Sequence, residues 1–185
     1  MKKLNLYKTE NIDDLAYPKE KRDLTVESPA LEFFTDFNKV MPLVISSSTL
    51  IINLQELMVK AHVKLKFVIS ENEQFIGVIS SSDVIPRKIV KKVSEGYKRE
   101  ELKVIDLMKS KNDLIALDIN EVENAQIGDV IDALKESGQQ HCLVLDRESH
   151  KIRGIFSASD ISRKLQLSID IQDSSSFYKV FSATS

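Results

Sequence analysis

A short phrase that occurs twice constrains the fold of this chain more than any other feature. Residues 77–83 read Gly-Val-Ile-Ser-Ser-Ser-Asp and residues 154–160 read Gly-Ile-Phe-Ser-Ala-Ser-Asp, which places the two aspartates 77 positions apart. The apolar pair after each glycine suits a strand interior, whereas serine and aspartate favour helix N-termini because their side chains accept hydrogen bonds from free backbone N–H groups. The duplication therefore predicts two equivalent strand-to-helix corners.

The flanking residues predict the same order of elements around both copies. In the first copy, apolar positions from Leu50 to Ala61 mark the buried face of a helix, and the remaining expected strands and helix are residues 42–45, 67–69, 75–79 and 82–93. In the second copy, Gly138 ends a helix that begins near Ile127, and the matching segments are residues 115–117, 141–145, 152–156 and 159–167. The predicted fold class is α/β (α+β), with two β-α-β-β-α repeats.

The segments outside the repeats have other patterns. Residues 1–27 are dense in charge and are interpreted as an extended arm. Ser28-Pro29 resembles a helix start, and the short helix is expected to bury Phe33, Phe34 and Phe37 on the body of the protein or against a second copy. The polar, serine-rich C-terminal segment indicates a loose end with at most one docked turn. We divide the chain into residues 1–37, 38–95, 96–167 and 168–185.

Composition and motifs argue against several functions. A formal net charge of −2 over 185 residues disfavours a general nucleic-acid binder. Lys2 and Lys3 precede no apolar signal region and no segment has the apolar length to span a bilayer, so the expected location is cytoplasmic, without a membrane partner. The single cysteine, Cys142, lies in an apolar run and is expected to be a small buried side chain.

Recognisable catalytic patterns are missing from the sequence. The scattered glycines form neither a dinucleotide-binding fingerprint nor a P-loop. The histidines at 62, 141 and 150 have no metal-ligand spacing, and Cys142 has no cysteine partner, so a structural zinc site is not expected. We therefore predict that the protein is not an enzyme and requires no cofactor.

With these residues in view, the chain resembles a tandem pair of CBS domains, a Bateman module, over roughly residues 40–167. The resemblance implies two sheets packed about a pseudo-two-fold axis, with two clefts for an adenosine ligand such as AMP, ADP, ATP or S-adenosylmethionine. It also implies that Asp83 and Asp160 bind the ribose hydroxyls and that Ser80 and Ser157 contact ribose or phosphate. A carboxylate at such a corner can accept hydrogen bonds from both hydroxyls of a vicinal diol.

Adenine needs flat apolar walls, which the short strands and the apolar pairs of the two phrases could supply; the candidates are Val44, Ile45, Ala116, Val78, Ile79, Ile155 and Phe156. Arg87 and Arg163 lie one turn beyond the aspartates and are candidates for phosphate charge. Each polar candidate has a structural alternative. Asp83, Asp160 and the serines could be helix caps, and the arginines could belong to a solvated helix face.

Two functions follow from the resemblance. The first is a regulatory module that senses an adenosine nucleotide and transmits its occupancy to an unidentified partner or through a homodimer. The alternative is an oligomerisation module with vestigial, unoccupied clefts, paired through the aromatic N-terminal helix or the helices that flank the sheets. The resemblance implies that two such modules commonly pair into a flat disc.

Overall fold

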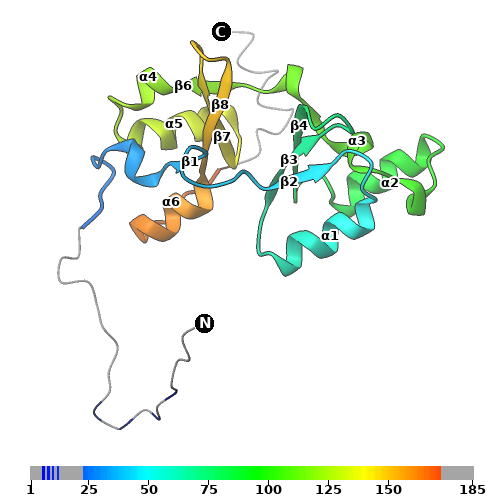
Figure 1. Cartoon of the computed structure of the whole chain (residues 1–185), viewed down its shortest axis with the longest axis horizontal. Coiled ribbons are helices and arrows are strands. Elements are labelled where there is room, and N and C mark those ends of the chain that lie inside the picture. The colour runs from blue at the N-terminus through cyan, green and yellow to red at the C-terminus, as the bar shows by residue number, and fades with distance from the viewer. Residues whose placement is uncertain (1–5, 7, 9, 11, 13–22, 172–185) are drawn as a thin grey trace.

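A computed structural model describes residues 6, 8, 10, 12 and 23–171. Its strands form two four-stranded sheets that lie side by side along the long axis of the molecule (Figure 1). The first sheet has the order β2 (Val44–Ser46), β3 (Leu65–Ile69), β4 (Phe75–Ser80), β5 (Lys109–Ser110). The second has the order β1 (Thr35–Asp36), β8 (Lys151–Ser157), β7 (His141–Asp146), β6 (Ala116–Asp118). Each sheet corresponds to one predicted repeat, and the predicted fold class is confirmed.

Helices pack on the outer face of each sheet and form one buried core with it in each repeat. The first repeat carries α1 (Ile51–Lys60), α2 (Pro86–Ser94), η2 (Arg99–Glu101) and α3 (Val104–Leu107). The second carries η3 (Lys111–Asp113), α4 (Ile119–Val122), α5 (Ile127–Ser137) and α6 (Ala158–Leu165), with the N-terminal turn η1 (Ala30–Phe33) packed against it. None of the helices in the described residues is long and apolar enough to cross a membrane.

The two repeats exchange their first strands. β1 precedes the first repeat but pairs antiparallel with β8 of the second, with Asp36 opposite Gly154. In the same way, β5 precedes the second repeat but pairs with β4 of the first, with Ser110 opposite Gly77. Each sheet is therefore closed by the segment that leads into the other repeat, so the repeats cannot separate without breaking strand pairs.

This exchange explains why each repeated phrase begins with glycine. A Cβ atom on Gly77 would lie 2.2 Å from the carbonyl oxygen of Lys109 in β5. One on Gly154 would lie 2.2 Å from the carbonyl oxygen of Thr35 in β1 and 2.3 Å from the Phe34 ring. Neither glycine has a positive φ. Glycine is required at these positions because the backbone of the neighbouring strand approaches too closely to leave room for a side chain.

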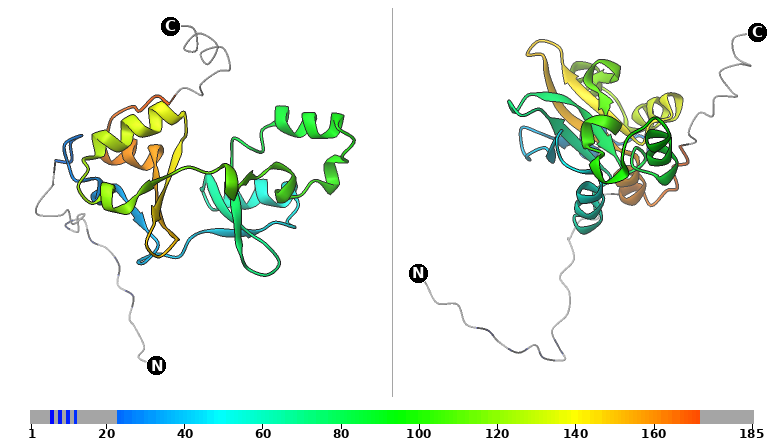
Figure 2. Two further views of the ribbon diagram at one scale, coloured as in Figure 1. Left: turned by 90° about the horizontal axis from the view of Figure 1, so that it is seen from above. Right: turned by 90° about the vertical axis from the view of Figure 1, so that its right-hand side faces the viewer.

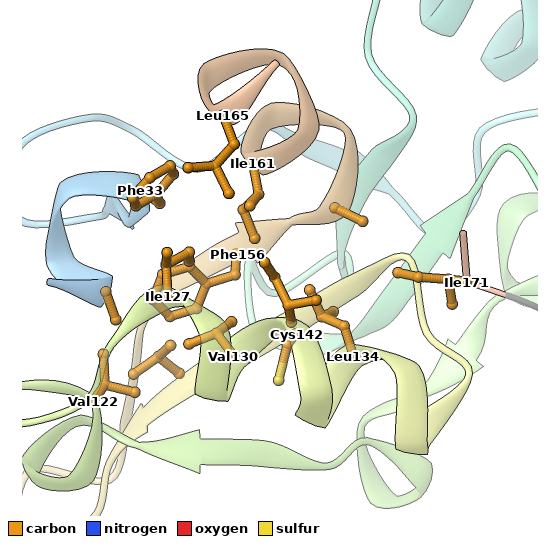
Figure 3. Packing of buried hydrophobic residues seen from close by; sticks show 14 of the residues in the cluster. Phe33, Val122, Ile127, Val130, Leu134, Cys142, Phe156, Ile161, Leu165 and Ile171 are labelled. Atoms are coloured by element: carbon orange, nitrogen blue, oxygen red, sulfur yellow. The ribbon is translucent and has the colours of Figure 1, made fainter. Parts of the chain in front are cut away.

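Successive residues of the phrases point to opposite faces of each sheet. Ile79 and Phe156 are fully buried in the cores beneath the helices, and Figure 3 shows Phe156 at the centre of the second core. The preceding residues, Val78 and Ile155, instead face between the sheets, where they form a third apolar cluster that joins the two repeats. The molecule is thus layered as helices, sheet, sheet, helices.

The aromatic N-terminal segment packs on its own chain. The expected helix after Ser28-Pro29 is only the single turn η1, which follows Pro29. Phe33 is 3% exposed in the second core (Figure 3). The ring centroid of Phe34 lies 5.3 Å from that of Phe156, and that of Phe37 lies 5.1 Å from that of Phe67. The aromatic side chains of this segment therefore pack on the body of the protein, with Phe33 buried and Phe34 and Phe37 half-buried.

Both ends of the described chain dock more closely than the sequence suggested. The sequence predicted an extended arm up to residue 27, but the last residues of this segment dock on the second repeat. The Gly128 N–H donates to the Val26 carbonyl, and Leu24 packs against the second core. At the other end, Ile171 is 7% exposed and belongs to the same core. The rest of the predicted arm, apart from residues 6, 8, 10 and 12, and the tail from residue 172 lie outside the described residues.

Candidate functional site

A cleft of about 560 Å³ opens where the two repeats meet. The first repeat contributes the end of β4, the turn after it and the start of β3, and the second contributes the residues before β6 and the start of β7. The lining residues include Val78, Ser80, Asp83, Lys88, Lys64, Leu65, Lys109, Leu114, Ile115, Gln140, His141, Leu143 and Ile171. A molecule bound here would contact both repeats at once.

Asp83 is held firmly at one wall of this cleft. Its Oδ2 accepts hydrogen bonds from the Ser80 N–H at 2.9 Å and from the Ser80 hydroxyl at 2.6 Å. Its Oδ1 accepts from Lys88 Nζ at 2.7 Å, and the side chain is 17% exposed. Two carboxylate oxygens offer about four acceptor positions in total. These three hydrogen bonds fill both positions on Oδ2 and leave one on Oδ1 for a further donor.

The turn that carries Asp83 differs from the predicted helix start. The sequence predicted a helix from residue 82, but α2 begins at Pro86, and residues 81–85 form a turn. Pro86 occupies a first helical position, and a residue before proline is driven to extended backbone; Ile85 has φ −69° and ψ 152°. The proline was therefore the signal that should have placed the helix start, and Asp83 lies on a turn rather than at a helix N-terminus.

The second corner has a different hydrogen-bond arrangement. Here α6 begins directly after Ser157, whose hydroxyl accepts a hydrogen bond from the Asp160 N–H at 3.4 Å as a helix N-cap. Asp160 lies in the first turn of α6, and its Oδ1 accepts from Arg163 at 2.7 Å. Its side chain is 41% exposed and is not among the residues that line the cleft. Only the Asp83 corner therefore opens into this cleft.

The cations near the aspartates are also arranged unequally. Lys88, not Arg87, pairs with Asp83 and lines the cleft, together with Lys109 from β5. Arg87 is exposed and is not among the lining residues. Arg163 stays with Asp160, with its side chain 76% exposed. The positive charge available to a phosphate in this cleft thus comes from Lys88 on α2, Lys109 on the exchanged strand and Lys64 just before β3.

The apolar candidates divide between the cleft and the cores. Val78 lines the cleft, whereas the fully buried Ile79 and Phe156 offer no surface to a ligand. Two of the others are covered by the protein: Ile155 is buried between the sheets, and Ile45 packs against the first core. The last two are exposed outside this cleft. Val44 is 45% exposed at the opposite end of the interface, and Ala116 is exposed in β6.

Residues from the other repeat complete the wall, and the sequence reasoning did not select them. Leu114 and Ile115, just before β6, contribute apolar surface, and His141 at the start of β7 contributes a ring. Burial lowers the pKa of His141, and Lys64 lowers it further, while the nearby Asp160 carboxylate opposes both effects. His141 is therefore held largely neutral at pH 7. These contacts join distant segments, and only the fold brings them together.

No metal centre is evident in the part of the chain that the structure describes, where no group of three or more potential metal-ligating side chains converges. Cys142 is 7% exposed in the second core, as predicted, and burial raises the pKa of its thiol. A thiol in this environment is a packing element rather than a nucleophile.

The CBS domain family model matches this sequence in two segments, residues 36–88 and 104–167, one over each repeat. Together with the paired sheets and the cleft between them, this match places the chain in the CBS domain family, as a tandem pair. No curated protein matches the sequence significantly.

Solved structures share the fold at low sequence identity. A protein of uncharacterised function from Pyrococcus horikoshii is 21% identical, with a TM-score of 0.56 over 80% of this chain and 100% of that one. CBSX2 in complex with AMP is 23% identical, with a TM-score of 0.52 over 74% and 94%. The CBS domain pair of MJ0100 in complex with 5′-methylthioadenosine and S-adenosyl-L-methionine is 17% identical, with a TM-score of 0.50 over 74% and 98%.

Proposed function

We propose that this protein is a regulatory module that binds an adenosine ligand in the cleft between its repeats, with Asp83 Oδ1 accepting a hydrogen bond from a ribose hydroxyl. The observation that carries the proposal is the position of the Asp83 carboxylate, which is fixed by Ser80 and Lys88 at the wall of a cleft shared by both repeats. The adenosine compounds in the CBSX2 and MJ0100 structures support the ligand class.

The remaining walls suit the other parts of such a ligand. Val78, Leu114 and Ile115 offer apolar surface for a flat base, as small-molecule sites commonly do. Lys88 and Lys109 supply positive charge at the same wall, where phosphate or carboxylate groups form charge-assisted hydrogen bonds. AMP, ADP, ATP and S-adenosylmethionine all combine a base, a vicinal diol and a charged group, so the ligand is proposed as a class.

Binding across the repeats gives a route to regulation. A ligand that bridges two bodies changes their equilibrium only by binding one arrangement more tightly than another. Because the strand exchange keeps the repeats connected through β1 and β5, the expected change is a small adjustment of their packing, which would be passed to a partner protein or a second copy.

Titration calorimetry with AMP, ADP, ATP and S-adenosylmethionine tests the proposal. We expect at least one to bind more tightly than about 1 mM, which corresponds to about −4 kcal/mol. Asp83→Asn should weaken that ligand by about tenfold or more, because a charge-assisted hydrogen bond contributes about 1.5 to 3 kcal/mol. Asp160→Asn should have a smaller effect, since Asp160 does not line this cleft.

The matched control is Asp132→Asn, an equivalent change at an exposed position on α5, which should leave binding unchanged. If the folded protein binds none of the four compounds at millimolar concentration, or if Asp83→Asn binds as the parent does, the proposed site is wrong.

A homodimer is the form in which we propose that the module works. Several large apolar side chains on the helices of the first repeat are exposed, namely Ile52, Leu57, Val59 and Val90. Burial of such side chains at a contact between copies would be favourable. Light scattering should give twice the monomer mass, and Val59→Asp combined with Val90→Asp should give the monomer mass; a monomeric parent protein would refute the dimer.

A further inference from the structure

A second hollow, of about 420 Å³, lies at the other end of the interface between the repeats. Leu65 at the start of β3 lines the first cleft, whereas Ile69 at the end of the same strand lines this hollow; four residues of strand span about 13 Å. The turns of the β3–β4 and β7–β8 hairpins point to the same side of the molecule (Figure 2, left). Glu73 and His150 from these two turns line the hollow.

The hollow straddles the pseudo-symmetry axis of the repeats. Three of its lining pairs occupy equivalent positions in the two repeats, 76 or 77 residues apart: Ile69 with Leu145, Glu73 with His150, and Phe75 with Ile152. The members of the last two pairs differ in chemistry. A site on the axis is therefore built from unequal halves and presents one face that is aromatic and one that is aliphatic.

Three phenylalanines make the aromatic face. The Phe37 and Phe67 rings meet edge to face with centroids 5.1 Å apart, and the Phe67 and Phe75 centroids are 5.8 Å apart. Phe67 is buried, but Phe37 and Phe75 are only half-buried, and Val44 beside them is 45% exposed. The interface core thus continues outward as an open apolar wall instead of closing over itself.

Positive charge gathers at the mouth of the hollow. Lys111 Nζ lies 5.8 Å from the centroid of the Phe75 ring, within the range of a cation–π contact. Lys151 also lines the hollow, and Glu73 is its one acidic lining residue, with His150 as the remaining titratable group. Two lysines against one glutamate favour a ligand that carries a negative charge.

We propose that this hollow is a binding site for a small aromatic carboxylate, separate from the nucleotide cleft. The aromatic ring of the ligand would pack against Phe67, Phe75 and Ile152, and its carboxylate would reach Lys111 and Lys151 at the mouth. The volume is within the range of small-molecule sites, and such sites combine an apolar lining with a few polar groups that orient the ligand. Because the ligand would touch both hairpins, it would act on the same interface as the nucleotide.

Calorimetry with indole-3-acetate as the probe tests this site, and indole-3-acetamide serves as its neutral counterpart of similar shape. We expect indole-3-acetate to bind with a dissociation constant below about 5 mM. The amide, and the variant Lys111→Gln combined with Lys151→Gln, should weaken binding about fivefold to tenfold, because the ion pair is lost. Lys60→Gln combined with Lys135→Gln, at exposed positions on α1 and α5, is the charge-matched control.

A second variant separates binding from folding. Val44→Trp adds a ring at a side chain that is 45% exposed, so it fills the hollow without removing a buried contact, and it should abolish binding while the protein remains folded. Asp83→Asn and saturating AMP should leave probe binding detectable, since the two sites share no lining residue. Absence of probe binding, equal binding of acid and amide, unchanged binding to Val44→Trp, or displacement of the probe by AMP at the hollow itself would each overturn the proposal.

Discussion

Replacing Gly154 by alanine should destabilise the protein through the exchanged strand β1. The new Cβ would lie 2.2 Å from the Thr35 carbonyl oxygen and 2.3 Å from the Phe34 ring, whereas real Cβ atoms essentially never approach closer than 3.0 Å. β1 must therefore move by about 1 Å, which adds overpacking of about 1 to 3 kcal/mol and weakens a strand hydrogen bond contributing about 1 kcal/mol. The expected loss in the free energy of unfolding is about 2 to 4 kcal/mol.

Urea unfolding followed by circular dichroism measures this loss. Gly77→Ala should cost slightly less, because its Cβ meets only backbone atoms of β5 and no aromatic ring. Gly128→Ala is the matched control: its Cβ would lie 3.2 Å from the Val26 carbonyl oxygen, and alanine in a helix is favoured over glycine by about 1 kcal/mol. A Gly154→Ala protein as stable as the Gly128→Ala control would refute the strand exchange.

Further predictions concern single side chains. Burial lowers the pKa of His141, so the unfolded chain binds a proton more readily than the folded one, and the free energy of unfolding should fall as the pH drops below about 6.5. His141→Leu, which installs the residue found at the equivalent position 65, should flatten the dependence of stability on pH in this range. An unchanged dependence would show that His141 does not cause it. Phe33→Ala should cost about 3 to 5 kcal/mol in urea unfolding, because Phe33 is 3% exposed in the second core; a cost below about 1 kcal/mol would mean that the N-terminal segment does not dock. Cys142 should react with iodoacetamide far more slowly in the native protein than in urea, and equal rates would show that its thiol is accessible.

The repeated elements could be predicted because their patterns are local. The helical apolar period from Leu50 to Ala61 corresponds to α1, although Leu57 and Ala61 of the predicted buried face are exposed. Gly138 ends α5 with φ 63°, a left-handed conformation that glycine adopts without strain. The paired strands around both hairpin turns are also confirmed. In each case a few neighbouring residues carry the whole signal.

The strand exchange could not be predicted because its evidence is not local. β1 and β5 are two residues long, too short for any alternation to be recognised. The glycines of the repeated phrases indicate that another part of the chain approaches the strand closely at these positions. The sequence does not show which segment that is. The start of α2, in contrast, could have been predicted from the sequence, because Pro86 favours the first position of a helix.

The candidate site was predictable on one side only. Val78, Ser80 and Asp83 line the cleft and come from the phrase itself. Ile115 and His141 come from the other repeat, and nothing in their own sequence context marks them as cleft residues. The same alternation that directs Val78 to the cleft buries Ile79 in the core, so an apolar pair in a strand supplies a ligand with one residue and the core with the other.

The proposed role of Asp83 in ribose recognition can be tested by calorimetry that compares AMP with 2′-deoxy-AMP on the parent protein and on Asp83→Asn. We predict that the parent binds AMP about tenfold more tightly than the deoxy compound, because one charge-assisted hydrogen bond is lost, and that the difference largely disappears in the variant. Equal affinities of the parent protein for the two nucleotides would contradict the account.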